Sequence, residues 1–128
     1  MNEGLIAGAI RARENAHAPF SGFKVGAALE DENGRVFTGC NIENATFGLT
    51  LCAERVAVFK ALSEGSRKFR RIAVAADTEK LTPPCGACRQ ILWEFCGDVE
   101  ILLANLRGDV ESLRLAALFP RAFDASFL

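Results

Sequence analysis

Long hydrophobic runs are missing from this sequence. Half of its 128 residues are hydrophobic, but a charge or a glycine interrupts every apolar run before the ~18 residues that a membrane-spanning helix requires. The first eleven residues include an acidic Glu3 and no apolar core that ends in a cleavage site, so no secretory signal is expected. We therefore expect a soluble, cytoplasmic protein that does not contact a membrane.

The sequence also has almost no excess charge and only one histidine. The formal net charge is -1, and the longest basic run, at 67–71, is too short to form the electrostatic footprint of a nucleic-acid-binding protein. This favours a small neutral substrate and no nucleic-acid partner. A lone histidine is more often a surface or hydrogen-bonded residue than a metal ligand, so we leave His17 out of the candidate site.

The cysteines argue against a disulfide framework. There are five, and an odd number with a Cys-x-x-Cys pair and no signal peptide fits a reducing compartment and a bound metal better. The pair is Cys85 and Cys88, directly after Pro84, and Cys52 comes earlier with Glu54 two residues after it. Three thiol ligands leave one coordination position of zinc open for a water molecule, as in catalytic sites.

A Cys or His ligand, a nearby glutamate that is not a ligand and a later Pro-Cys-x-x-Cys form the pattern of zinc-dependent nucleobase deaminases. Glu54 would then carry protons beside the zinc-bound water. Arg55, in the same predicted helical turn as Cys52, is our candidate for donating hydrogen bonds to the thiolates.

Two other interpretations of the cysteines stay open. The Cys-x-x-Cys pair by itself is also typical of a redox dithiol. A structural zinc knuckle would need a fourth ligand, which Cys40, Cys96 or His17 would have to supply.

Hydrophobic patterning predicts a single α/β domain over 1–128, with three layers and a mixed central β-sheet that has helices on both faces. The zinc site is expected where two helix N-termini meet near strand ends. We predict helices from Asn2 to the Ala18-Pro19 break, from Cys52 to Gly65, from Cys85 to Gly97 and over 113–119, and strands over 23–29, 36–40, 72–76 and 99–104, with a hairpin turn at Asn33-Gly34.

Five stretches of the chain together resemble the short, single-domain, homotetrameric cytidine deaminases, and the likeness extends from about Ala16 to Phe123. The central stretch is Cys52-Ala53-Glu54-Arg55, and Phe20 and Phe47 stand where tyrosine is common in such enzymes. The other stretches are His17-Ala18-Pro19-Phe20-Ser21-Gly22-Phe23-Lys24-Val25-Gly26-Ala27-Ala28, Gly39-Cys40-Asn41-Ile42-Glu43-Asn44-Ala45, Pro84-Cys85-Gly86-Ala87-Cys88-Arg89-Gln90 and Leu118-Phe119-Pro120-Arg121-Ala122-Phe123.

The resemblance implies hydrolytic deamination of cytidine and 2'-deoxycytidine in pyrimidine salvage, with zinc-bound hydroxide attacking C4 of the pyrimidine. It also implies a homotetramer with shared active sites. The implied residues are Cys52, Cys85 and Cys88 as ligands of one zinc per chain, Glu54 as proton shuttle, Asn41 and Glu43 as partners of the ribose hydroxyls, Phe23 and Ala53 at the nucleoside pocket, and Phe123 stacking on the pyrimidine of a neighbouring subunit.

Other functions share these motifs. A related zinc deaminase acting on a nucleoside antibiotic, or on a cytosine within a polynucleotide, would have the same metal residues, although the basic groove expected for the latter is missing. A zinc-stabilised binding domain without catalysis would need a fourth protein ligand.

Overall fold

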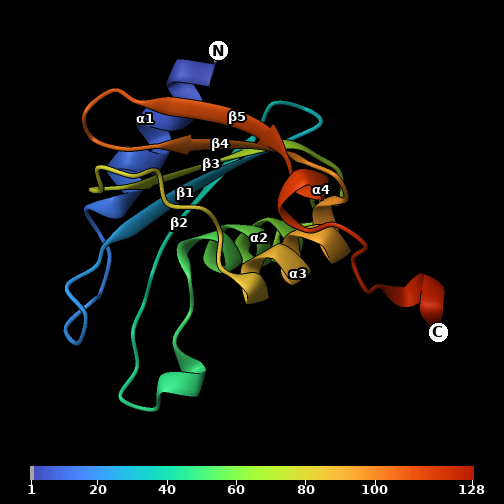
Figure 1. Ribbon diagram of the computed structural model, residues 1–128, viewed down its shortest axis with the longest axis horizontal. Coiled ribbons are helices and arrows are strands. Elements are labelled where there is room, and N and C mark those ends of the chain that lie inside the picture. Colours follow the sequence, from blue (N-terminus) through green and yellow to red (C-terminus); the bar gives the residue numbers. More distant parts are fainter. Residues whose placement is uncertain (1) are drawn as a thin grey trace.

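A five-stranded sheet with the strand order β2-β1-β3-β4-β5 forms the centre of the computed structural model, which describes residues 2–128 (Figure 1). Strands β3 and β4 are parallel, and the other neighbouring pairs are antiparallel. The mixed sheet predicted from the sequence is therefore confirmed. The helices are α1 (Asn2–Arg13), α2 (Ala53–Ser63), α3 (Gly86–Cys96) and α4 (Leu115–Leu118), and the strands are β1 (Val25–Asp31), β2 (Val36–Cys40), β3 (Phe69–Ala76), β4 (Glu100–Ala104) and β5 (Val110–Arg114).

The hairpin between β1 and β2 forms where Asn33-Gly34 predicted it. Gly34 has a φ of 85°, a left-handed conformation that glycine adopts without a steric penalty. The Asp31 carboxylate accepts hydrogen bonds from the backbone N–H groups of Asn33 and Arg35, both at 2.9 Å. These contacts fix the turn and with it the register of the two strands.

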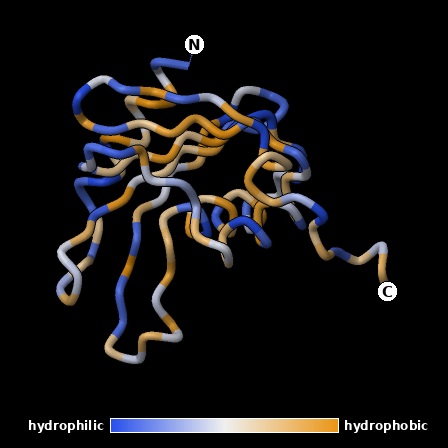
Figure 2. Tube along the Cα trace, viewed as in Figure 1, coloured by the Kyte–Doolittle hydropathy of each residue, from blue (hydrophilic) through white to orange (hydrophobic). Residues whose placement is uncertain are grey.

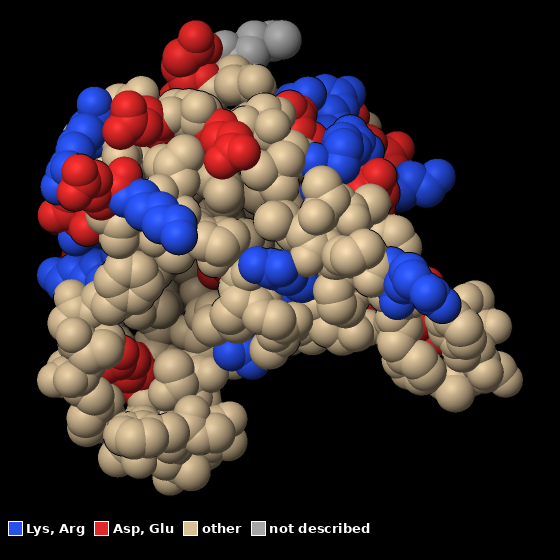
Figure 3. All heavy atoms as spheres, viewed as in Figure 1, with Lys and Arg blue, Asp and Glu red and all other residues tan. Residues whose placement is uncertain are grey.

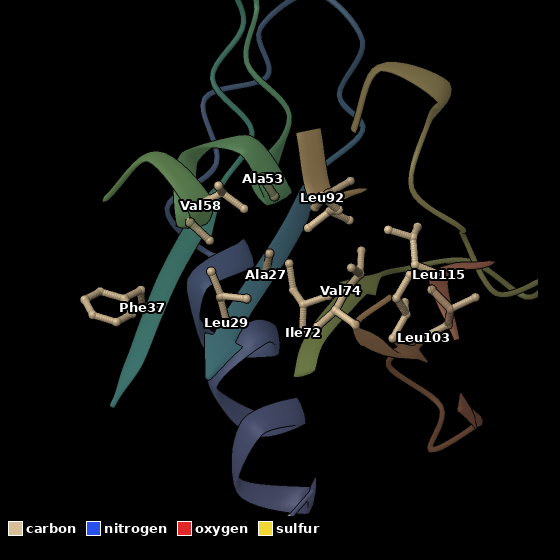
Figure 4. Packing of buried hydrophobic residues seen from close by; sticks show 14 of the residues in the cluster. Ala27, Leu29, Phe37, Ala53, Val58, Ile72, Val74, Leu92, Leu103 and Leu115 are labelled. Atoms are coloured by element: carbon tan, nitrogen blue, oxygen red, sulfur yellow. The ribbon is translucent and has the colours of Figure 1, made fainter. Parts of the chain in front are cut away.

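The sheet is buried on both faces, which makes three layers. Small side chains on one face, among them Ala28, Ala73 and Ala75, pack against Leu5 and Ala9 of α1. The larger core lies on the other face, and Figure 4 shows Val58 of α2 and Leu92 of α3 among the residues that pack there. The hydropathy colouring agrees, because apolar residues are concentrated along the central strands (Figure 2).

Several of the expected element boundaries are wrong. Helix α1 ends at Arg13, well before Pro19, because Glu14 to Ala16 continue in a tighter turn with hydrogen bonds to the carbonyls three residues earlier. Strand β1 begins at Val25, so Phe23 precedes the strand. Strand β3 begins at Phe69, three residues earlier than predicted.

The C-terminal side contains a strand that the sequence reasoning missed. Strand β5 occupies Val110–Arg114, which includes the first two residues of the helix predicted over 113–119, and α4 is a single turn. β5 is an edge strand whose residues are mostly exposed, so it carries little apolar alternation. Within 2–128, no helix has the length and apolar character needed to cross a membrane.

Candidate metal centre

Two of the predicted ligands stand at the N-termini of neighbouring helices. Cys52 is the N-cap of α2 and Cys85 is the N-cap of α3, each with an extended backbone conformation. The partial positive charge at a helix N-terminus stabilises a thiolate. The prediction that the metal cysteines open two helices is confirmed, and Figure 1 shows α2 and α3 on the same side of the sheet.

The structure brings the three thiols together. Their Sγ atoms all lie within 4.8 Å of one another, and the Sγ atoms of Cys52 and Cys85 are 3.8 Å apart. A tetrahedral zinc ion with Zn–S bonds of about 2.3 Å separates its sulfur ligands by about 3.8 Å. Cys88 is buried and Cys85 is exposed, so the cluster forms a wall between the core and a pocket.

No fourth protein ligand joins this cluster among the described residues. Within 2–128, the three cysteines Cys52, Cys85 and Cys88 are the only group of three or more His, Cys, Asp or Glu side chains whose ligand atoms lie close enough together to hold one metal ion. Cys40, Cys96 and His17 are not part of this group. This arrangement leaves a coordination position for water and disfavours a closed structural knuckle.

The pKa values of Cys52 and Cys88 are shifted in opposite directions. The pKa of Cys52 is lowered to about 5, chiefly because its sulfur accepts a hydrogen bond from Cys88 and also because Arg55 lies beside it. The pKa of Cys88 is raised, since it is the donor in that bond and is buried. Metal binding requires loss of the remaining thiol protons, and zinc would replace the shared proton as the positive centre.

Arg55 lies beside the thiols as predicted. Its Nη2 atom is 3.3 Å from the Sγ atom of Cys52 and 3.3 Å from the carbonyl oxygen of Thr50. Its Nε atom is buried and is without a partner among the described residues. A half-buried guanidinium next to a cluster of thiols fits a site that becomes more negative when the ligands ionise.

Glu54 is a buried carboxyl in the first turn of α2. Its side chain is only 4% exposed, and this burial raises its pKa to about 7, with the charge on Cys52 acting in the same direction. A carboxyl with a pKa close to neutral can both accept and release a proton under ordinary conditions. Glu54 and the thiols of Cys52 and Cys85 line one pocket.

Three of the predicted substrate residues line this pocket too, namely Phe23, Asn41 and Ala53. The Oδ1 atom of Asn41 accepts a hydrogen bond from the Val25 N–H at 2.9 Å, and its Nδ2 atom donates to the Phe23 carbonyl at 2.7 Å. Asn41 thus fixes the chain that leads from Phe23 into β1.

Glu43 lies in a neighbouring hollow. Its carboxylate accepts hydrogen bonds from the backbone N–H groups of Phe20 and Ser21 and from the Ser21 hydroxyl, at 2.8, 3.1 and 2.5 Å. Phe20 and Phe47 form the apolar wall of this hollow, with their ring centroids 5.8 Å apart. Thr50 lines both the hollow and the metal pocket, so the two spaces adjoin.

Phe123 is not among the described residues that line its own pocket. It lies in the C-terminal arm, which we define as residues 119–128 and which projects from the body of the subunit (Figure 1). The Phe123 side chain is 58% exposed and stacks on Phe127 with a centroid distance of 5.6 Å. The end of this arm is mostly uncharged in the space-filling view (Figure 3).

Sequence reasoning missed two residues that support the site. The Thr50 carbonyl accepts a hydrogen bond from Arg55, and the Thr50 hydroxyl accepts one from the Asn44 N–H. Its position two residues before Cys52 was the sequence feature that could have identified it. Arg89 donates from Nε to the Pro84 carbonyl at 2.8 Å. Its position directly after Cys88 was the signal there.

The class of zinc-dependent deaminases is defined by an α/β fold in which a three-thiol cluster and a buried carboxyl lie at helix N-termini, as they do here. The protein-family model described as the cytidine and deoxycytidylate deaminase zinc-binding region matches residues 1–103 of the chain. The chain therefore belongs to the cytidine deaminase family.

Named relatives resemble the chain over most of its length. It is 53% identical to the cytidine deaminase of Sporosarcina psychrophila over 122 residues, which cover 94% of this chain and 90% of the relative. It is 54% identical to the cytidine deaminase of Halalkalibacterium halodurans over 122 residues, which cover 94% of this chain and 92% of the relative. A crystal structure of cytidine deaminase from Burkholderia pseudomallei superposes with a TM-score of 0.93 at 48% identity and covers 96% and 99% of the two chains.

Proposed function

We propose that this protein hydrolyses cytidine and 2'-deoxycytidine to uridine and 2'-deoxyuridine, with release of ammonia. The observation that carries the proposal is one pocket that contains the three-thiol cluster and the buried Glu54. The named relatives are cytidine deaminases, which supports a cytosine nucleoside as the substrate.

The chemistry divides between the metal and Glu54. Zinc bound by Cys52, Cys85 and Cys88 would act as a Lewis acid that makes a water molecule a better nucleophile. Glu54 would take one proton from that water and pass it to N3 of the pyrimidine, and would then take the second proton from the hydroxyl group added at C4 and pass it to the leaving amine. Water and the nucleoside are consumed and the uracil product and ammonia leave, so Glu54 ends each cycle in its starting state.

Arg55 compensates the charge of the ligands. Three thiolates around Zn²⁺ leave a net charge of about -1, which makes bound water less acidic. The guanidinium, 3.3 Å from the Cys52 sulfur, draws electron density away from that ligand and restores part of the acidity.

The pocket walls support an assignment of the sugar and base positions. We assign Phe23 and Ala53 to the nucleoside pocket, and Asn41 and Glu43 to the ribose hydroxyls. Asn41 lies in the metal pocket and Glu43 in the adjoining hollow, which supports a sugar that extends from one space toward the other. The Glu43 carboxylate would repel a phosphate on the sugar, so the nucleoside is preferred to the nucleotide.

We further propose a homotetramer in which Phe123 of one subunit closes the pocket of another by stacking on the pyrimidine. The support is that Phe123 and Phe127 are 58% and 70% exposed on the C-terminal arm, an arrangement that an interface explains. We place this single-domain enzyme in the cytoplasm, in pyrimidine salvage.

Ammonia release from a panel of cytosine compounds tests the function. Cytidine and 2'-deoxycytidine should release ammonia, whereas cytidine monophosphate and a cytosine-containing oligonucleotide should react at least ~10-fold more slowly. The Glu54→Gln variant serves as the control for contaminating deaminases. Turnover of the oligonucleotide in preference to both nucleosides would contradict the proposal.

Zinc analysis tests the ligand set. We expect about one zinc per chain in the wild-type protein and in the Cys40→Ser and Cys96→Ser variants, because neither thiol belongs to the cluster. Replacing Cys88 by Ser should remove most of the metal. A folded Cys40→Ser or Cys96→Ser protein without zinc would show that the ligand assignment is wrong.

A further inference from the structure

Helix α3 holds the C-terminal segment through three side-chain donors. Arg89 donates from Nη1 to the Leu118 carbonyl at 2.6 Å, and Gln90 donates from Nε2 to the Phe123 carbonyl at 2.9 Å. Trp93 donates from Nε1 to the Asp124 carboxylate at 2.8 Å. The third contact joins two side chains, so it depends on both residue identities. The same helix presents Cys85 and Cys88 to the metal site.

Trp93 is a rigid donor. Its ring is half-buried and packs against the larger core, so the indole N–H has a fixed position on the outer side of α3. Because its acceptor is an ionised carboxylate, the bond is stronger than one between neutral groups.

Asp124 divides its two oxygens between the helix and the arm. Oδ2 accepts from Trp93, while Oδ1 accepts from the N–H and the hydroxyl of Ser126 at 2.9 and 2.5 Å. The Ser126 contacts cap the short 3-10 turn Ala125–Phe127, and Phe127 stacks on Phe123. One carboxylate thus connects α3 to the two stacked rings.

The turn before these contacts is strained. Arg121 has a φ of 53°, a left-handed conformation that a residue with a side chain rarely adopts. Such a conformation persists only where the surrounding contacts determine it. Here the Arg89 contact at Leu118 and the Gln90 contact at Phe123 hold the chain on either side of Arg121.

We propose that Trp93 and Asp124 are positioning residues, whose hydrogen bond sets the direction of the C-terminal arm and presents the Phe123 ring to a neighbouring subunit. This inference rests on the proposed role of Phe123 in the shared site. Without the bond, the arm samples more orientations, and ordering the ring over the substrate carries a larger entropic cost. Loss of the bond should therefore mainly raise KM and leave kcat less affected.

Two conservative variants test the bond. Trp93→Phe keeps a large aromatic ring in the core and removes the N–H donor. Asp124→Asn keeps the size of the side chain but removes its charge and one of its two acceptor oxygens, so the bond from Trp93 is either lost or reduced to the weaker bond of a neutral acceptor. Each should lower kcat/KM for cytidine about 3- to 10-fold, the range expected for one hydrogen bond, with one zinc per chain retained. Loss of zinc in either variant would overturn the proposal, because the effect would then pass through the metal site.

Fluorescence gives a readout that is independent of activity. Trp93 is the only tryptophan in the chain, so a changed emission spectrum of Asp124→Asn directly reports the loss of the carboxylate charge from its contact with the indole N–H. Ser126→Ala is the matched control, because it removes the hydroxyl contact to Asp124 and leaves the Trp93 bond in place. It should keep the wild-type emission and kcat/KM. An Asp124→Asn spectrum identical to wild type would contradict the inference.

A double-mutant cycle separates positioning from other effects. In a Phe123→Ala background, Asp124→Asn should cause no further loss of kcat/KM. The same loss in both backgrounds would show that Asp124 acts elsewhere. If Phe123→Ala lowers kcat/KM while Trp93→Phe and Asp124→Asn do not, the positioning role is wrong and the shared site stands. If Phe123→Ala itself has no effect, the shared site is wrong and the positioning role is lost with it.

Discussion

At the scale of single residues, Glu54 concentrates the proposed chemistry. It is buried in the first turn of α2, and its pKa is raised to about 7. Glu54→Gln keeps the size and hydrogen-bonding reach of the side chain but cannot transfer protons. We expect kcat to fall by at least ~10² to 10⁴, while zinc content and the unfolding temperature stay near wild type. A turnover rate close to wild type in zinc-loaded protein would remove Glu54 from the mechanism.

Arg55 should act on the metal more than on the proton transfers. Arg55→Ala removes the donor to the Cys52 sulfur and leaves more negative charge on the ligands, so we expect lower kcat and zinc that a chelator removes more easily. Supporting residues of metal sites typically change affinity or activity ~10- to 100-fold. Chelator competition, followed by metal analysis, measures this. Arg55→Lys keeps the charge and loses the planar guanidinium, so its kcat and its resistance to the chelator should lie between those of the wild type and Arg55→Ala. Unchanged zinc affinity and rate in Arg55→Ala would make Arg55 a structural residue only.

At the scale of elements, the metal site depends on how closely α2 approaches the sheet. A Cβ atom on Gly39 of β2 would lie 2.5 Å from the Ala53 carbonyl oxygen and 2.6 Å from the Ala57 backbone nitrogen. Both atoms belong to the backbone of α2, so the helix would have to move. The Ala53 peptide lies between Cys52 and Glu54, and displacement of this turn would displace both.

Gly39→Ala should therefore weaken zinc binding and lower kcat, in addition to a stability loss of ~1 to 3 kcal/mol from overpacking. Gly26→Ala is the matched control, since a Cβ there would meet the backbone of α1 at Ala9 and Arg13, on the opposite face. Both variants should unfold at lower temperature, and only Gly39→Ala should affect chelator resistance and kcat. If the two variants lose stability alike and both keep wild-type zinc binding, the approach of α2 is a packing feature alone.

The elements also differ in how far the sequence predicts them. Helices α2 and α3 were predicted well because their apolar residues recur at helical spacing and a glycine follows each helix, Gly65 with a φ of 93° and Gly97 with a φ of 66°. Such signals are local. Strand β5 was missed because an exposed edge strand needs no apolar alternation, and its pairing with β4 is a tertiary contact.

The same distinction applies to the site. Cys52, Glu54, Cys85 and Cys88 follow from two short motifs, whose spacing on helix N-termini is local information. The division of Asn41 and Glu43 between two adjoining spaces depends on the path of 41–50, a segment without periodicity. Its conformation is set by contacts such as the one between Glu43 and Ser21, which are distant in sequence.

At the scale of the whole molecule, the charges and the apolar rings occupy different parts of the surface. Charged side chains are gathered around the sheet, whereas the end of the C-terminal arm is mainly uncharged (Figure 3). Phe123 and Phe127 remain exposed on this arm, and large exposed rings that stack on each other are typical of an interaction surface. Phe123 is not among the described residues that line the metal pocket of its own chain. A site that includes the Phe123 ring therefore requires a second copy of the chain.

Subunit mixing tests the shared site. Glu54→Gln subunits lack the proton shuttle and keep Phe123, whereas Phe123→Ala subunits keep Glu54 and lack the ring. If the ring acts on a neighbouring subunit, mixed oligomers contain some pockets with both groups intact. We expect kcat/KM per subunit with an intact Glu54 to rise on mixing. Stacking of the ring contributes ~0.5 to 1.5 kcal/mol beyond its buried area, so the recovery should be at least ~2- to 12-fold for a complete pocket.

The matched control mixes Phe123→Ala subunits with the double variant Glu54→Gln, Phe123→Ala, which supplies subunits without any ring. This mixture should show no recovery, because every pocket lacks the aromatic contact whatever the assembly. Native mass spectrometry establishes that mixed oligomers have formed and gives their subunit number, which we expect to be four. If verified mixed oligomers of the first pair also show no recovery, the ring acts within its own subunit or not at all. A fully active wild-type monomer would exclude the shared site directly, because no second subunit would then be present to supply Phe123.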